Sequence, residues 1–162
     1  MKYDTLTGRR LKEPFNHISW VHSTLQLKNF NLKQCFFGEH LLNTSNFPVA
    51  SVESEKTAVI SSFYFPQFIW LASGSLQNLK SSMFERLKGR SIILFPDTSL
   101  KGIAFNKWLQ VATELVNLEY NCITSDFLEL NASIQEKENG VDLADYLVKY
   151  AISEFLGKDN KV

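Results

Sequence analysis

Two carboxylates follow apolar, strand-like segments of this sequence. Glu53 comes directly after residues 48–52, and Asp97 follows residues 91–95 after one proline. If these segments are neighbouring strands of a parallel sheet, both side chains meet at the edge where such sheets bind ligands. Converging carboxylates repel each other without a cation, and they suit Mg²⁺ or Mn²⁺, which also bind water and phosphate. The pattern therefore favours a divalent-metal site formed by Glu53 and Asp97, with Glu55 as an additional ligand.

A purely structural interpretation fits the same residues. Glu53 and Glu55 would stand near the first turn of a helix, where negative charge favours the helix dipole. Asp97 would be a turn residue or a helix cap after Pro96. Lys56 is equally ambiguous, because it either contacts a phosphate as a point charge or is solvated. On the pattern alone the structural interpretation is the commoner one.

Strand-like and helix-like segments alternate along most of the chain. Four apolar segments read as strands: 49–52, 69–72, 92–95 and 120–124. Four segments read as helices: 53–60, 76–87, 104–118 and 142–156. Such alternation predicts an α/β fold, with a mostly parallel four-stranded sheet flanked by helices. We expect this core domain to span residues 48–156, followed by a tail at 157–162.

The first 47 residues are predicted to form an extension packed on the core. Thr7-Gly8 is typical of a turn, so residues 3–25 are interpreted as a β-hairpin and its continuation, with a β-rich stretch at residues 18–22. Residues 36–42 form an apolar stretch with an embedded glycine, which fits a short helix or a strand.

Charge is unevenly distributed although the net charge is zero. The front half carries an excess of lysine and arginine, and the last 44 residues carry an excess of acids. Arg9, Arg10 and Lys12 lie on or after the predicted hairpin turn and are candidate contacts to a nucleic-acid backbone. The competing interpretation is that these residues are solvated.

Cysteine, histidine and hydropathy patterns exclude several classes of protein. Cys35 and Cys122 have apolar neighbours and are expected to be reduced, buried thiols. His17, His22 and His40 lack a zinc-ligand spacing relative to either cysteine, so they are interpreted as structural. The sequence has no transmembrane-length apolar run and no signal-peptide pattern, which predicts a cytoplasmic protein without a membrane partner. It also lacks the motifs of P-loop NTPases and of serine hydrolases.

Three segments resemble the Toprim domain, the divalent-metal module of primases. Residues 52–58, Val-Glu-Ser-Glu-Lys-Thr-Ala, resemble the Val-Glu-Gly-Glu-Lys-Asp-Ala segment of phage and plasmid primases, with Ser54 at the glycine position. Residues 92–97 look like the strand that carries the Toprim Asp-x-Asp motif. Residues 140–147 are similar to the Lys-Asp-Pro-Asn-Asp-Leu segment that follows the Toprim core. The resemblance covers residues 36–147.

The chain is also similar, more closely, to a bacterial family of uncharacterised proteins often encoded near mobilisable elements. The similarity lies in segments 3–4, 7–9, 20–22, 34–42 and 52–58. In that family the domain tends to follow an N-terminal zinc-binding segment. The sequence contains none, so the chain is expected to be a fragment of a longer protein or a stand-alone remnant.

The Toprim resemblance implies roles for individual residues. Glu53 takes the place of the glutamate that acts as general acid or base, and Asp97 that of the first Mg²⁺-binding aspartate. The second aspartate position falls on Ser99, and a two-metal clamp needs more carboxylates than remain. The implied site therefore holds one Mg²⁺ or Mn²⁺ weakly, and the sequence leaves open whether turnover survives.

Three functions follow from these observations. The first is a Toprim-like nucleic-acid-associated domain of a primase or mobilisation-type protein, which binds DNA or RNA weakly and contacts other replication or mobilisation proteins. The second is a non-catalytic docking module derived from the same fold, for which the apolar stretch 63–68 would be an interface if exposed. The third is an unrelated nucleotide-binding α/β domain.

Overall fold

The computed structural model describes residues 2, 4–6, 11, 13–15, 19–75 and 79–155. The chain divides into two compact units, Met1–Lys33 and Gln34–Val162. This division falls within the predicted N-terminal extension, residues 1–47. The predicted hairpin turn at Thr7-Gly8 and the predicted tail, residues 157–162, lie outside the described residues.

The larger unit is built on a four-stranded parallel sheet, as predicted. Its strands are β1 (Val49–Val52), β2 (Ile69–Ala72), β3 (Ser91–Leu94) and β4 (Asn121–Thr124). They are arranged in the order β2-β1-β3-β4, and each neighbouring pair is parallel. All four residues of β1 and of β2 are buried, as expected for strands covered on both faces. The predicted α/β class is therefore confirmed.

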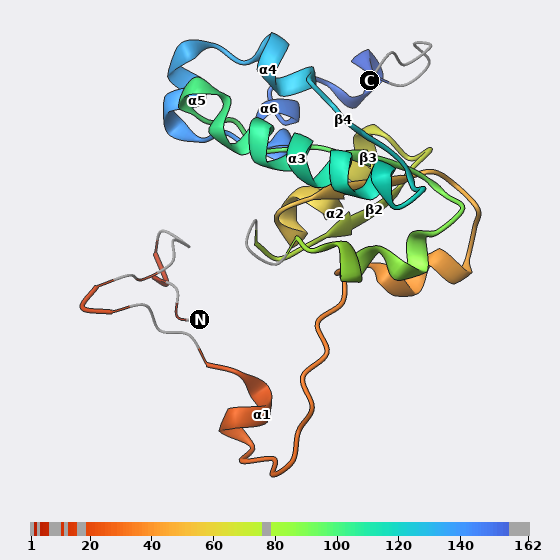
Figure 1. Cartoon of the computed structure of the whole chain (residues 1–162). Helices are drawn as coiled ribbons and strands as arrows, with labels where there is room; N and C mark the ends of the chain where they lie inside the picture. Colours follow the sequence, from red (N-terminus) through yellow and green to blue (C-terminus); the bar gives the residue numbers. More distant parts are fainter. Residues whose placement is uncertain are drawn as a thin grey trace. The chain divides into compact units, whose positions relative to one another are not determined.

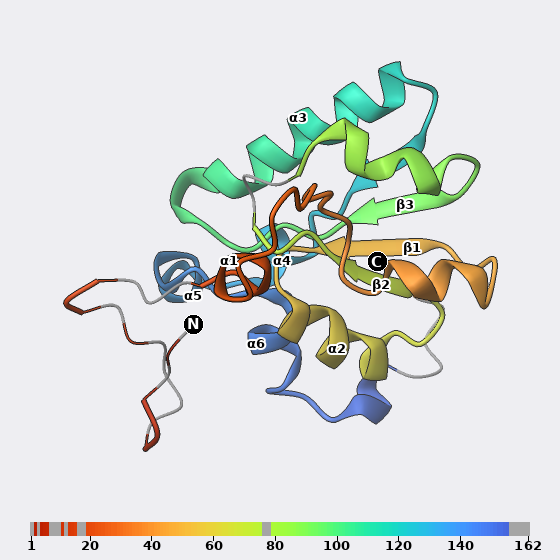
Figure 2. The same cartoon turned by 90° about the horizontal axis from the view of Figure 1, so that it is seen from below.

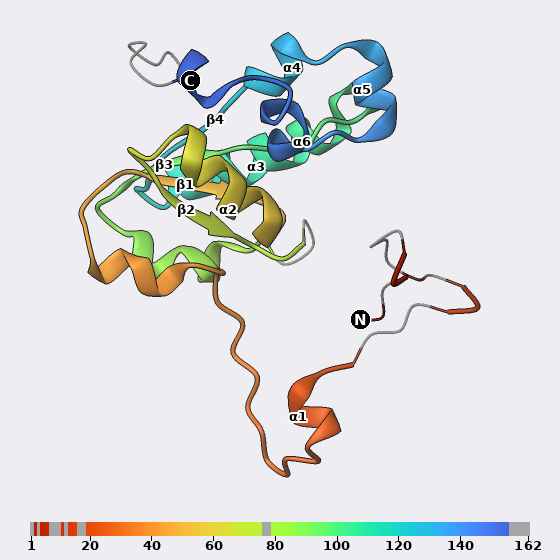
Figure 3. The same ribbon diagram turned by 180° about the vertical axis from the view of Figure 1, so that it is seen from behind.

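Helices cover the two faces of the sheet. Helix α3 (Ile103–Asn117) and the 3₁₀ helix η3 (Ser81–Leu87) pack on one face. Helices α2 (Glu55–Tyr64) and α6 (Leu143–Leu147) pack on the other. Figure 2 shows the strands between these two layers, with α3 on one side and α2 and α6 on the other. Figures 1 and 3 show the two faces in turn, α3 in front in the first and α2 in the second.

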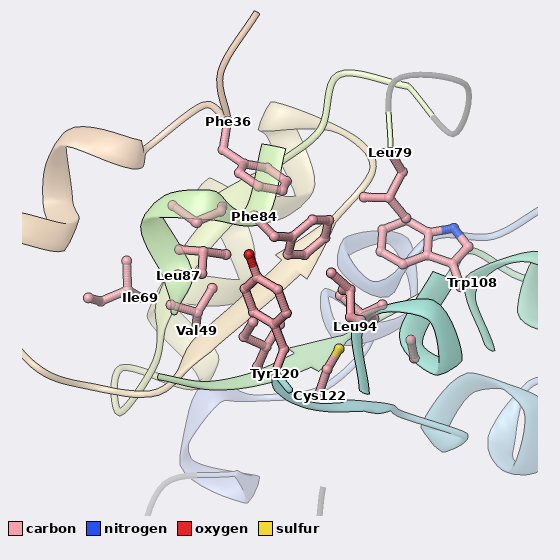
Figure 4. Close-up of a cluster of buried hydrophobic side chains, with 14 of the residues drawn as sticks. Phe36, Val49, Ile69, Leu79, Phe84, Leu87, Leu94, Trp108, Tyr120 and Cys122 are labelled. Atoms are coloured by element: carbon pink, nitrogen blue, oxygen red, sulfur yellow. The ribbon is translucent and has the colours of Figure 1, made fainter. Parts of the chain in front are cut away.

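The face under α3 and η3 is filled by large apolar side chains. Phe36, Phe84 and Trp108 gather over the strand residues Val49 and Leu94 (Figure 4). The Phe36 and Phe84 rings meet edge to face, with centroids 5.1 Å apart, the arrangement that the ring quadrupoles favour. Because Phe36 is part of this core, the segment before β1 is packed on the sheet of the larger unit.

Residues 36–42 contain both of the predicted alternatives in miniature. Phe37 forms an antiparallel bridge to Ala72 on the outer edge of β2. Gly38 then turns the chain with φ +81°, and the 3₁₀ helix η1 (Glu39–Asn43) follows. A Cβ at Gly38 would lie 2.8 Å from the Trp70 carbonyl oxygen, so this tight approach needs glycine.

The predicted helix over residues 142–156 is wrong in its length. The structure has the short helix α6 and, after extended backbone at Ala151, the 3₁₀ helix η5 (Ile152–Glu154). The break lets the Phe155 ring pack on the rings of Tyr64 and Phe65, with centroids 5.6 and 5.5 Å away. Two short helices that the periodicity did not predict precede α6: α4 (Phe127–Asn131) and α5 (Ile134–Asn139).

Two further predictions need correction. In the unit Met1–Lys33, the β-rich stretch predicted at residues 18–22 overlaps one helical turn, α1 (Val21–Thr24). This turn is held by local bonds, since the Thr24 N–H donates to the Trp20 carbonyl at 2.9 Å. Cys35 is exposed rather than buried, whereas Cys122 is buried as predicted. No helix in the described part of the chain has the length and apolar character needed to cross a bilayer.

Candidate functional site

Glu53 and Asp97 leave the sheet at the same edge. Strands β1 and β3 are direct neighbours, with Ser51 paired to Leu94, and the Phe95 N–H extends the pairing by donating to the Ser51 carbonyl at 2.8 Å. Continuing this register places Glu53 and Asp97 in the two adjacent loops that follow the strands. The spacing of the motifs thus brings the two predicted ligands to one edge, which we call the carboxylate edge.

Asp97 is held in surroundings that oppose its ionisation. Burial raises the pKa of the Asp97 carboxyl to about 7, and the charges of Glu53 and Asp142 raise it further, whereas Lys56 acts in the opposite direction. A carboxyl that is mostly buried beside other acids is stabilised either by a proton or by a cation. The carboxylate edge therefore has the electrostatic character of a cation site.

Lys56 is engaged with two aspartates from the far end of the chain. Its Nζ lies 2.9 Å from Asp142 and 2.8 Å from Asp145. Partial burial lowers the pKa of Lys56, but the hydrogen bonds and charges of Asp145 and Asp142 outweigh this and raise it above its ordinary value. Lys56 is therefore charged and already paired, so binding a phosphate would mean exchanging one or both of these partners.

Hydroxyl groups connect the start of α2 to the same aspartate. The Thr57 hydroxyl donates to Asp142 Oδ2 at 2.8 Å, and it lies 2.8 Å from Ser54 Oγ. Ser54 caps α2 by accepting from the Thr57 N–H at 3.2 Å. Asp142 caps α6 in turn by accepting from the Asp145 N–H at 2.8 Å. Sequence reasoning assigned no role to Thr57, Asp142 or Asp145; the only signal was the resemblance of residues 140–147 to a primase segment.

The loop after β3 is fixed on both sides of Asp97's neighbour, Thr98. The Thr98 N–H and hydroxyl both donate to the Val141 carbonyl, at 3.0 and 2.8 Å. Ser99, at the position of the second Toprim aspartate, accepts from the Ala104 N–H at 2.8 Å. Its hydroxyl therefore satisfies a backbone donor at the start of α3.

The ligand set at the carboxylate edge is small. Among residues 2, 4–6, 11, 13–15, 19–75 and 79–155, no three acidic, histidine or cysteine side chains are close enough to hold a metal ion. Glu55 is exposed in the first turn of α2, where it favours the helix dipole. Glu53 and Asp97 can supply two oxygen ligands, and Mg²⁺ is commonly bound by one or two carboxylates with water and phosphate completing its shell. The residues present fit such a weakly held ion.

The other predicted site residues are not part of this edge in the structure. Arg9, Arg10 and Lys12 lie outside the described residues. His22 stacks on Phe30 at 4.7 Å within the N-terminal unit, and His40 is exposed on η1. Burial raises the pKa of the Cys122 thiol to about 12, so this cysteine is not a reactive thiolate.

A second feature of the larger unit is an apolar groove of about 550 Å³. It runs between η1, α2 and the start of β2, and we call it the β2 groove. Large apolar side chains dominate its lining, and five of them are more than one-third exposed: Phe37, Leu41, Phe47, Val59 and Phe63. Scattered apolar residues are normal on protein surfaces, but a contiguous set is typical of a binding surface.

Comparisons with known proteins show one family. No curated protein and no solved structure matches the chain. Residues 1–98 match the family described as a domain of unknown function, DUF6371. The matched segment includes Glu53, Lys56 and Asp97 and ends before Asp142. Since it covers more than half of the 162 residues, the chain belongs to the DUF6371 family.

Proposed function

We propose that this protein is a Toprim-like, nucleic-acid-associated domain of a primase or mobilisation-type protein that works in the cytoplasm. The observation that carries the proposal is the meeting of Glu53 and Asp97 at one edge of adjacent parallel strands, with the Asp97 carboxyl largely buried. Burial of this carboxyl near Glu53 and Asp142 costs free energy that a divalent cation would offset. Carboxyl ends of parallel strands are also where α/β sheets bind ligands.

In this proposal each residue has a defined task. Asp97 and Glu53 hold one Mg²⁺ or Mn²⁺, with Glu55 as an additional ligand, and the ion neutralises the charge of a phosphate group. Glu53 is also the group that accepts or donates a proton at the substrate. Lys56 contacts the phosphate after giving up Asp145, its more exposed partner. Arg9, Arg10 and Lys12 contact the nucleic-acid backbone.

A metal titration of the full chain tests the proposal. Wild-type protein should bind Mn²⁺ with a dissociation constant in the submillimolar to millimolar range, about 10⁻⁴–10⁻³ M, as expected for few protein ligands. Glu53→Gln and Asp97→Asn should each weaken binding by about tenfold or more. Glu114→Gln, on the exposed side of α3, removes the same charge away from the edge and should bind as wild type does. Equal Mn²⁺ binding by wild type and Asp97→Asn would refute the site.

Nucleic-acid binding has its own test. Affinity for single-stranded DNA or RNA should fall steeply as salt rises, because phosphate contacts release counterions. Replacing Arg9 and Arg10 together by alanine should lower both the affinity and the salt slope, by about one unit of slope for each lost contact. Binding that is insensitive to salt would contradict this part of the proposal.

The β2 groove favours a second candidate function, a non-catalytic docking module. Its exposed phenylalanines lie beside an edge strand, on the opposite flank of the sheet from β4. If this is the function, the chain binds no Mn²⁺ at the carboxylate edge, and Glu53→Gln leaves every binding property unchanged. The metal titration therefore separates the two candidates.

A further inference from the structure

Two adjacent residues near the end of the chain bond to both loops of the carboxylate edge. Val141 accepts two hydrogen bonds from Thr98, the residue that follows Asp97. Asp142 accepts a hydrogen bond from Thr57, which belongs to the first turn of the helix that follows Glu53. We call this pair of residues the 141–142 clamp.

The hydrogen bonds at Thr57 have only one consistent direction. Asp142 lacks a proton to give while it is ionised and paired with Lys56, so the Thr57 hydroxyl hydrogen points to Asp142 Oδ2. Ser54 must then donate its own hydrogen to Thr57 Oγ1, 2.8 Å away. A chain of oriented hydroxyls therefore runs from Asp142 to Ser54, the residue next to Glu53.

Asp142 itself is poorly placed to be a metal ligand. Its Oδ2 accepts from the Thr57 hydroxyl and from the Lys56 ammonium, and its Oδ1 accepts from the Asp145 N–H. The residue is 8% exposed, so its three donors come from the protein. A carboxylate with this many fixed donors holds other groups in place.

The sheet alone does not determine how far apart Glu53 and Asp97 lie. Backbone pairing of β1 and β3 extends to the bond between Ser51 and Phe95, and both acids come after it. Beyond that point the two loops are tied to consecutive residues of a third segment. Val141 and Asp142 are joined by a planar peptide, so the separation of their two attachment points is nearly constant.

We infer that the 141–142 clamp positions Glu53 and Asp97 for cation binding, with Asp142 and Thr57 as positioning residues. This inference rests on the proposed function of the carboxylate edge. The clamp lies beyond residues 1–98, the segment that matches the family. The C-terminal part of the chain is therefore required for a site whose ligands all come from the first part.

Threonine-to-valine substitutions test the clamp in the full chain, because they remove a hydroxyl and leave every charge in place. Thr57→Val and Thr98→Val should each weaken Mn²⁺ binding by about tenfold or more, the effect typical of residues that orient metal ligands. Thr57→Ser and Thr98→Ser keep the hydroxyl and should restore most of the affinity. Thr124→Val is the control, since the buried Thr124 hydroxyl has no hydrogen-bond partner.

Amide hydrogen exchange gives a second readout that does not depend on metal. If the clamp couples the loops, Thr57→Val should speed exchange at the Thr98 amide, and Thr98→Val should speed exchange at the Thr57 amide. Folded valine variants that bind Mn²⁺ as tightly as wild type would overturn the inference. Exchange effects confined to the mutated loop would overturn it as well.

The two readouts also separate this inference from the proposed function. A wild-type chain without Mn²⁺ binding, but with crossed exchange effects, would refute the metal site and support the clamp as a coupling between the loops. Mn²⁺ binding that survives both valine substitutions would support the metal site and refute the clamp.

Discussion

The carboxylate edge and the β2 groove belong to the same compact unit, but they use their side chains in opposite ways. At the edge, charged groups are partly or fully buried, and Lys56 and Asp142 are tied to specific partners. In the groove, Phe37 and Phe63 are 45% and 64% exposed. Burying charge is unfavourable unless the charge has a purpose or a partner, and exposing large apolar groups invites association. The edge is therefore organised for ions, and the groove for apolar contact.

The largest effect is expected at the wall of the groove, where Gly38 meets the edge strand. A Cβ in Gly38→Ala would lie 2.8 Å from the Trp70 carbonyl oxygen, a backbone atom that cannot move aside easily. We expect a loss of about 3 kcal/mol in the free energy of unfolding, measured by urea denaturation, from left-handed strain plus the clash.

Gly89→Ala provides a matched control for this clash. Gly89 has the same φ of +81°, but nothing lies within 4 Å of the added Cβ. This variant should lose about 1 kcal/mol, the cost of left-handed backbone alone. Equal losses in the two variants would mean that the close approach of η1 to β2 does not contribute to the groove wall.

A somewhat smaller effect is expected at the carboxylate edge, and its sign depends on pH. The folded-state pKa of Asp97 is about 7, above the ordinary value of 3.8. Between these values the folded protein binds more protons than the unfolded chain, so metal-free stability falls as pH rises through this window. At pH 8, Asp97→Asn should therefore be more stable than wild type, by on the order of 2 kcal/mol.

Thermal melts at two pH values check this prediction. Near pH 4 the Asp97 carboxyl is protonated in the folded protein, so the difference between Asp97→Asn and wild type should largely vanish. At pH 8, Mn²⁺ should raise the melting temperature of wild type and leave that of Asp97→Asn unchanged. A variant that is less stable than wild type at pH 8 without metal would show that Asp97 is ionised and favourably paired.

The smallest effect on stability is expected on the exposed side of the groove. Phe63→Ser should change the free energy of unfolding by no more than about 0.5 kcal/mol, because the ring is 64% exposed. It should nevertheless reduce the binding of an apolar fluorescent dye to the folded protein, and leave Mn²⁺ binding intact. Leu130→Ser, at a residue on α4 that is 75% exposed, should not reduce dye binding. Equal dye binding by all three proteins would remove the groove as an apolar binding surface.

The parallel sheet was predictable because its strands are short apolar runs with buried residues on both faces. The segments around Val49, Ile69 and Ile92 have no other stable environment than a covered sheet. The final helix was mispredicted because an apolar period in residues 142–156 does not show where the chain must turn back. The contact of Phe155 with Tyr64 and Phe65 determines that turn, and it joins residues about 90 positions apart in the sequence.

For the candidate site, the sequence by itself determined that carboxylates follow two neighbouring strands, since strand ends in a parallel sheet meet at one edge. Only the tertiary structure decided that Lys56 pairs with Asp142 and Asp145, and that Thr57 reaches Asp142 across 85 positions of sequence. The physical reason is that a strand's place in a sheet follows from local apolar pattern. The partners of polar side chains depend instead on which loops the packed helices bring together.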